Sequence, residues 1–166
     1  PITIEQELSA WLAQLESATA RLQDTGKRLQ CLPLGGTAVG TGVNADPKMT
    51  VLACRILSKQ TGLRVTPAAN KFESIAAQDH LVELSGQCNA LAVTLMKISN
   101  DLRWMNSGPL TGLSEAELPA LQAGSSIMPG KVNPVIPEAV AMVCAQVMGN
   151  HSTISIAGQS GNFQLN

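Results

Sequence analysis

Polar side chains gather in one short, helix-breaking stretch, Gly124 to Asn133, and Glu138 follows it closely. The stretch reads GSSIMPGKVN, so it holds two serines, one lysine and one asparagine. Pro129, Gly130 and Pro134 forbid a regular helix here, which leaves several backbone N–H groups without helical partners. Free N–H groups beside a lysine can face an anion. We therefore predict an anion-binding loop, against the alternative of a proline-rich loop with incidental polar residues.

The residues after Pro137 follow a helical pattern, with apolar side chains at Val140, Val143 and Val147. The loop therefore delivers Lys131 and Asn133 close to a helix N-terminus. Unpaired N–H groups and the helix macrodipole favour a carboxylate at that position. This fourth helix carries almost no charge, so we expect it to be buried on all sides.

Heptad spacing of apolar residues predicts a long first helix over residues 4–32. Thr3 and Gln6 read as a capping box at its start, and Pro33 ends it. Thr25 and Gly26 interrupt the apolar seam, and we interpret them as a kink or a local loss of packing. A seam this regular indicates packing against other helices at shallow angles.

Two more helices are expected between the glycine-rich segment and the loop. Asp46 and Pro47 cap a short helix that stops at Gly62, and residues 63–67 should be extended. A third helix is expected from about residue 70 to residue 107, longer than a compact domain of this size needs. Most of its polar residues, Asn100 and Arg103 among them, are assigned to a solvated face.

Composition favours an all-α protein. Hydrophobic residues make up 45% of the 166 residues and charged residues 14%, while aromatic residues are only 2% and tyrosine is absent. A core of Leu, Ala, Val, Ile and Met suits helix-on-helix packing better than a sheet. We expect a long-helix bundle, forming one domain over residues 1–166, that is completed by oligomerisation.

Charge and cysteine content argue against several classes of partner. A net charge of −1 offers no footprint for nucleic acid or an anionic membrane. The four cysteines lack metal-ligand spacing, and no signal peptide or apolar run of membrane length is present. We expect no metal and no organic cofactor, and a cytoplasmic protein, with the mitochondrial matrix open as an alternative.

A second glycine-rich segment, residues 34–44, includes Thr37 between closely spaced glycines. It lacks the lysine and spacing of a P-loop and follows no strand, so nucleotide binding is rejected. Tight turns and the wall of a small anionic pocket both fit its composition. Lys71, at the start of the third helix, is a further candidate for binding an anion.

The loop also carries a resemblance to known proteins. Gly124, Ser125, Ser126, Met128, Pro129, Lys131 and Asn133 resemble the signature of the fumarase/aspartase superfamily. Three other stretches resemble class II fumarate hydratases: LGGTAVGTGVN at residues 34–44, NKFE at residues 70–73 and SGNFQLN at residues 160–166. The resemblance runs almost from end to end, and family members are much longer. It implies that residues 1–166 are a central helical domain, truncated at both ends relative to the family.

The resemblance implies a cofactor-free enzyme of the tricarboxylic acid cycle that reversibly hydrates fumarate to (S)-malate through an aci-carboxylate carbanion. It implies catalytic roles for Ser125 as the base, Lys131 as a stabilising cation and Glu138 as the partner of a family histidine. That histidine lies in a T-H-x-x-D-A segment upstream of the position matched by Pro1. Substrate-binding residues would be Ser126, Lys131, Asn133, Thr37 and Lys71. The family assembles as a homotetramer whose subunits share each active site.

Two alternatives stay open. Gly130 resembles fumarate hydratase, since aspartases usually have alanine there, but Val135, Ile136 and Pro137 also occur in aspartases. Aspartate ammonia-lyase is therefore the alternative activity. The other alternative is that the chain by itself is an inactive assembly core of such a lyase.

Overall fold

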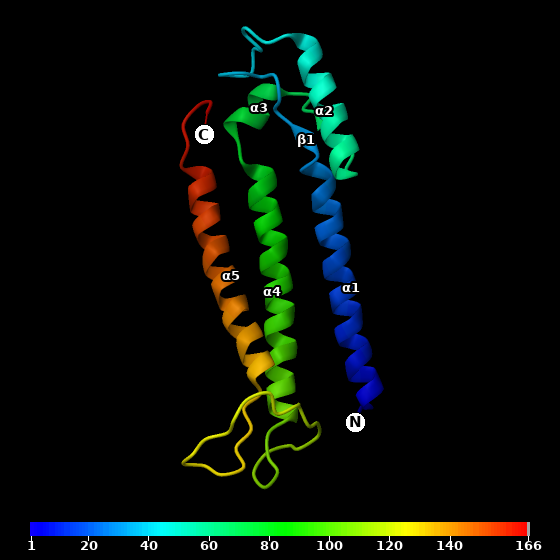
Figure 1. Cartoon of the computed structure of the whole chain (residues 1–166), viewed down its shortest axis with the longest axis vertical. Coiled ribbons are helices and arrows are strands. Elements are labelled where there is room, and N and C mark those ends of the chain that lie inside the picture. Colours follow the sequence, from blue (N-terminus) through cyan, green and yellow to red (C-terminus); the bar gives the residue numbers. More distant parts are fainter. Residues whose placement is uncertain (166) are drawn as a thin grey trace. The chain divides into compact units, whose positions relative to one another are not determined.

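The structure is a computed structural model that describes residues 1–165, folded into five helices and one pair of two-residue strands. The elements are α1 (Ile4–Arg28), β1 (Cys31–Leu32), α2 (Pro47–Thr61), β2 (Thr66–Pro67), α3 (Lys71–Ala76), α4 (Asp79–Met105) and α5 (Val135–Gln159) (Figure 1). The prediction of an all-α protein is confirmed. The last residue of the matched tail, Asn166, lies outside the described residues.

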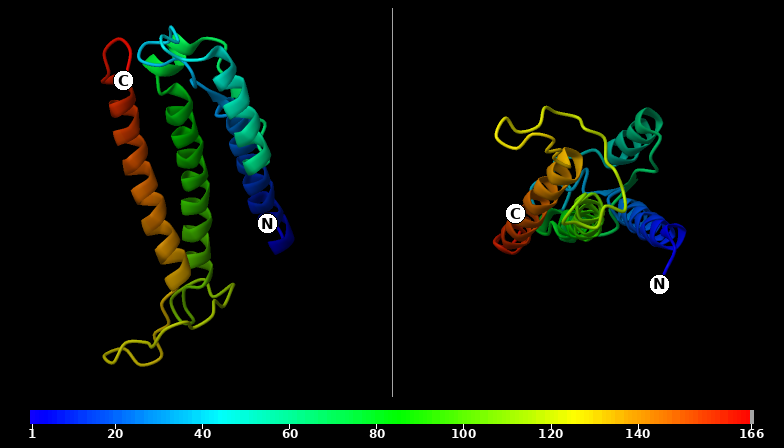
Figure 2. Two further views of the ribbon diagram at one scale, coloured as in Figure 1. Left: turned by 45° about the horizontal axis from the view of Figure 1, so that its top comes forward. Right: turned by 90° about the horizontal axis from the view of Figure 1, so that it is seen from below.

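The chain divides into two compact units. The first unit contains Pro1–Ser17 and Asn89–Asn150, and the second contains Ala18–Cys88 and the chain from His151 onward. In each unit a part of α4 and a part of α5 run side by side in opposite directions (Figures 1 and 2). That residues 1–166 act as one domain stays a prediction.

The predicted capping box forms at the N-terminus of α1. The N–H of Gln6 donates to Thr3 Oγ1 at 3.2 Å, and the N–H of Thr3 donates to Gln6 Oε1 at 2.9 Å. Buried positions then recur every seven residues, at Trp11, Ala18 and Thr25. Thr25 is 0% exposed, so the predicted loss of packing is wrong at Thr25, whereas a Cβ atom at Gly26 would meet no atom within 4 Å.

The end of α1 corrects another prediction. The helix stops at Arg28 instead of Leu32, and Cys31–Leu32 pairs in parallel with Thr66–Pro67. The N–H of Thr66 donates to the carbonyl of Gln30, and the N–H of Ala68 donates to that of Leu32, both at 2.8 Å. These long-range bonds replace the last helical turn, and short-range periodicity carries no signal for them.

Helix α2, in the second unit, has the predicted boundaries. The side chain of Asp46 accepts from the N–H of Lys48 at 2.8 Å, and Pro47 occupies the first turn. Gly62 ends the helix in the left-handed conformation, with φ of 72°, and its N–H donates to the carbonyl of Ser58 at 3.0 Å.

The predicted third helix is two helices. Asn70 caps the short α3 by accepting from the N–H groups of Phe72 and Glu73, and Ala77 then turns extended with φ of −124° and ψ of 148°. The carbonyl of Gln78 accepts the first bonds of the chain that continues as α4. Neither glycine nor proline marks this break, which is why periodicity alone predicted one continuous rod.

Helix α5 starts earlier than predicted, at Val135 instead of Glu138. Pro137 lies in the first turn, where its missing N–H costs no helical bond. The prediction that this helix is buried on all sides is wrong for the chain as it stands, because Met142 is 68% exposed and Val143 62%.

Small residues line the contact between α4 and α5 in the second unit. In the second unit, a side chain on Gly158 would meet Val82, and His151 Nδ1 lies 3.0 Å from Ser85 Oγ. In the first unit, Ala92 and Cys144 are buried, with 4% and 1% exposure. Burial raises the pKa of the Cys144 thiol, so it stays protonated and unreactive at neutral pH.

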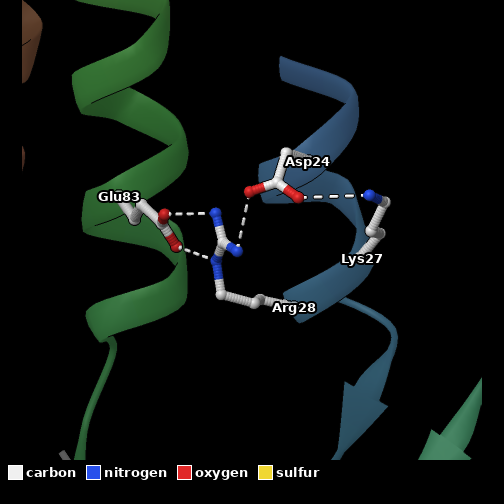
Figure 3. A network of polar contacts seen from close by, with 4 residues as sticks. All are labelled: Asp24, Lys27, Arg28 and Glu83. Carbon is white, nitrogen blue, oxygen red and sulfur yellow. Dashed lines mark hydrogen bonds and ion pairs between the residues drawn. The ribbon is translucent and has the colours of Figure 1, made fainter. Parts of the chain in front are cut away.

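An ion-pair network in the second unit joins the end of α1 to the start of α4 (Figure 3). Arg28 donates two hydrogen bonds to the carboxylate of Glu83, at 2.7 and 2.6 Å, and a third to Asp24 at 3.0 Å. Lys27 also donates to Asp24, at 3.1 Å. Lys27, followed by Arg28, lowers the pKa of Asp24, and Arg28 lowers the pKa of Glu83.

Large apolar side chains are exposed along the helices, among them Ile4, Leu8 and Leu12 on α1 and Ile136, Met142 and Val143 on α5. Large apolar patches on a protein surface are a common feature of interaction sites. Within the described chain, no helix combines the length and apolar character needed to cross a membrane.

Candidate active site

The loop with the superfamily signature, residues 124–133, belongs to the first unit and contains a tight turn. Ser125 Oγ accepts hydrogen bonds from the N–H groups of Ile127 and Met128, at 3.1 and 3.2 Å. The N–H of Lys131 then donates to the carbonyl of Met128 at 3.1 Å, and Gly130 takes a φ of 79°. The two N–H groups aimed at Ser125 would stabilise negative charge on its oxygen.

Gly124 lets the two ends of this loop approach each other. A Cβ atom at Gly124 would collide with the carbonyl oxygen of Lys131. A larger residue would therefore push the backbone at Lys131 away. The position of the lysine depends on the glycine seven residues before it.

The loop leads directly into the first turn of α5. The N–H of Val135 donates to the carbonyl of Asn133 at 2.9 Å, and the N–H of Glu138 donates to that of Pro134 at 3.1 Å. Asn133 therefore precedes the helix and Glu138 lies in its first turn, both half-buried. The sequence correctly predicted a helix N-terminus here, although it placed the start of the helix three residues late.

The end of α4 forms the other side of the site. Hydrogen bonds join it to the loop that connects α4 to α5, residues 106–134. The side chain of Asn106 accepts from the N–H of Leu118 at 2.8 Å, and Ser107 Oγ accepts from the N–H of Leu113 at 3.1 Å. These bonds fix the loop against the helix where α4 ends.

A hollow with a cavity volume of about 540 Å³ lies between these two segments of the first unit. Its lining comprises Lys131, Val132, Asn133, Pro134 and Glu138 together with Asn100, Arg103, Trp104, Asn106, Ser107 and Gly108. Three predicted site residues, Lys131, Asn133 and Glu138, are thus brought together. Ser125 and Ser126 lie on the same loop but outside this lining.

The charges around the hollow are available to a ligand. Within residues 1–165, neither Lys131 nor Glu138 forms an ion pair within 4.0 Å. Arg103 is likewise without a carboxylate partner there, and its Nη1 donates to Asn100 Oδ1 at 3.2 Å. The hollow is thus lined by two cations, Lys131 and Arg103, and by one carboxylate, Glu138. The sequence did not predict Arg103 as a site residue. Helical periodicity could not show which polar residues of α4 lie beside the loop at residues 124–133.

The other two predicted binding residues, Thr37 and Lys71, belong to the second unit. Lys71 lines a separate hollow of about 530 Å³ together with Gly40, Asn70 and Phe72. Thr37 is exposed, has a φ of 57° and lies outside that lining. The glycine-rich segment packs closely on α3, since a Cβ at Gly36 would lie 3.3 Å from the Cβ of Lys71. Close packing of the glycines fits the tight turns that composition left open as one interpretation of this segment.

Comparison with known proteins places these observations in a family. Residues 1–149 match the family described as Lyase. The chain belongs to this lyase family. Over all 166 residues the chain is 68% identical to the class II fumarate hydratase of Xylella fastidiosa and 56% identical to class II fumarate hydratase 2 of Pseudomonas aeruginosa.

A solved structure agrees with the sequence comparison. The class II fumarase of Schistosoma mansoni matches 99% of the chain with a TM-score of 0.96 at 42% identity. The chain covers 38% of that structure, and it spans 35% of the Xylella fastidiosa relative and 36% of the Pseudomonas aeruginosa one. These relatives carry the name fumarate hydratase or fumarase, so the aspartase alternative is not favoured.

Proposed function

We propose that the protein containing this chain reversibly hydrates fumarate to (S)-malate. The observation that carries the proposal is the hollow where Lys131 and Asn133 meet Glu138 at the start of α5. A cation, an amide and a helix N-terminus suit a carboxylate. The names of the relatives, at 68% and 56% identity, favour fumarate as the compound that bears it.

In the malate-to-fumarate direction, the reaction removes a proton from the carbon beside a carboxylate. The electron pair of that C–H bond moves onto the carboxylate, which becomes a doubly negative aci-carboxylate. Lys131 and Asn133 would stabilise this charge where it develops. The intermediate then expels the hydroxyl group, which leaves as water after taking up a proton.

Ser125 is the proposed base that receives the carbon-bound proton. A serine hydroxyl is a weak base unless its anion is stabilised. The N–H groups of Ile127 and Met128 already donate to its oxygen, and Lys131 lies on the same loop. Glu138 would pair with the family histidine and raise its basicity for handling the water.

The remaining binding roles rest on the resemblance. Ser126 is exposed on the loop, and Thr37 and Lys71 belong to the other unit, so we propose them as substrate-binding residues without a shared hollow. Residues from different copies of the chain would complete each site in a homotetramer. The exposed apolar side chains of α1 and α5 support assembly. We further propose a cytoplasmic enzyme of the tricarboxylic acid cycle.

The full-length protein tests the activity directly. Loss of fumarate absorbance in buffer with a chelator and without ammonia is expected, because the proposed chemistry uses no metal and no organic cofactor. Turnover that requires ammonia would identify an aspartate ammonia-lyase instead. We expect the 166-residue polypeptide by itself to be inactive, since it spans about a third of the length of its relatives.

A further inference from the structure

Arg103 lines the hollow that contains Lys131 and Glu138, although the sequence assigned it to a solvated helix face. It lies in the last turn of α4, and its side chain is exposed. Its Nη1 donates to Asn100 Oδ1 at 3.2 Å, and Asn100 lines the same hollow. This bond orients the guanidinium group without neutralising it.

The charges of the hollow and of its proposed ligand leave room for a further cation such as the guanidinium group of Arg103. A dicarboxylate carries two negative charges, whereas Lys131 offers one positive charge and Glu138 adds a negative one. Arg103 restores a net positive charge to the hollow. A guanidinium group has five N–H donors and matches a carboxylate with two parallel bonds, so one bond to Asn100 leaves donors for a ligand.

We propose that Arg103 is a further anion-binding residue of this hollow and pairs with a carboxylate of the substrate as it enters. The inference rests on the proposed function for the identity of the dicarboxylate. Positive charge in a cleft raises the local concentration of anionic substrate and speeds its capture. Arg103 therefore acts mainly on KM, and its effect weakens as salt screens the charge.

The test uses the full-length protein with Arg103→Gln and Arg103→Lys. Arg103→Gln is expected to raise KM for fumarate about tenfold and leave kcat within about twofold. Arg103→Lys should fall between the wild type and the glutamine variant, because it keeps the charge but loses the paired donors. Increasing salt should narrow the difference between wild type and Arg103→Gln.

Arg21→Gln is the matched control, since Arg21 is exposed on α1, has no ion pair within the described chain and lies outside the hollow. It removes the same charge and should leave KM unchanged. An arginine that serves only the helix dipole would change the melting temperature and not KM. An unchanged KM in Arg103→Gln, or an equal rise in Arg21→Gln, would overturn the proposal.

Calorimetric binding of succinate, an unreactive dicarboxylate, separates this inference from the proposed reaction. Weaker succinate binding in Arg103→Gln supports the anion site even if the wild type does not hydrate fumarate. If the wild type hydrates fumarate and Arg103→Gln binds succinate as tightly, the anion site is wrong and the reaction stands.

Discussion

Ser125 is the residue whose local geometry matches its proposed role most closely. Two N–H groups already donate to its oxygen, so an alkoxide formed there would need no rearrangement of the turn. Preorganised donors of this kind stabilise charge without reorganisation during the reaction. They belong to the turn from Ser125 to Met128, which directly precedes the turn that contains Pro129 and Gly130.

Replacing Ser125 by alanine removes the proposed base. We expect kcat for fumarate hydration to fall by about 10²- to 10⁴-fold, while thermal unfolding changes little, because the loop lies at the surface. Ser126→Ala is the neighbouring comparison, and it should raise KM with a smaller loss of kcat. A kcat loss that is larger for Ser126→Ala than for Ser125→Ala would contradict the assignment of the base.

The residues of the site differed in how far the sequence could predict them. Lys131, Asn133 and Glu138 are close along the chain, so their meeting in one hollow followed from the loop and the helix after it. Arg103 comes from α4, twenty-eight positions before Lys131 in the sequence, and it lines the hollow because the fold brings the end of α4 beside residues 131–138. Such long-range contacts leave no periodic signal.

At the scale of elements, capping residues predicted boundaries well and periodicity alone did not. Thr3 with Gln6, and Asp46 with Gly62, mark helix ends through local hydrogen bonds that the sequence specifies. The true end of α1 depends on strand pairing with Thr66–Pro67 instead. Pairing with a strand that is distant in the sequence sets the end of α1, so the periodic pattern predicted a helix that is too long.

The ion-pair network of Arg28 makes a prediction about pH. Asp24 and Glu83 have lower pKa values in the folded chain, so the network stabilises the fold fully above their unfolded values, about pH 4. That stabilisation is lost as the pH falls through the folded values. Arg28→Gln should lower the melting temperature at pH 7 by at most a few degrees, because the side chains are exposed.

The same comparison near pH 2 should show a smaller difference between wild type and Arg28→Gln. Lys27→Gln is the control, since it contacts Asp24 without reaching Glu83, and it should have the weaker effect. Melting temperatures at both pH values provide the measurement. A difference that grows on acidification would show that the network does not act through these carboxylates.

At the scale of the whole molecule, the exposed apolar residues support the proposed assembly with further copies of the chain. The sequence predicted rods too long for one compact domain, and the structure leaves Met142 and Val143 exposed on the nearly uncharged α5. Composition and periodicity predicted the helical class, but they could not show that a single chain leaves this helix uncovered.

Val143→Glu tests assembly in the full-length protein. A charge at a position 62% exposed in one chain should be tolerated by the monomer, whereas burial of that charge in an interface would be costly. We expect light scattering to report a tetramer for the wild type and smaller species for Val143→Glu. Gln146→Glu, at an exposed polar position of α5, should keep the tetramer. A monomeric wild type, or a tetrameric Val143→Glu, would refute an interface at this face.

The central claim, that Lys131 stabilises the aci-carboxylate during fumarate hydration, is tested most directly with Lys131→Met. Fumarate hydration is measured for the wild type and for this variant, both as full-length proteins, with chelator and without ammonia. Methionine keeps much of the length of the lysine side chain and removes the charge that would stabilise the aci-carboxylate. We predict that the wild type hydrates fumarate and that Lys131→Met lowers kcat by about 10²- to 10³-fold at an unchanged melting temperature. No hydration by the wild type, or wild-type turnover by Lys131→Met, would contradict the account.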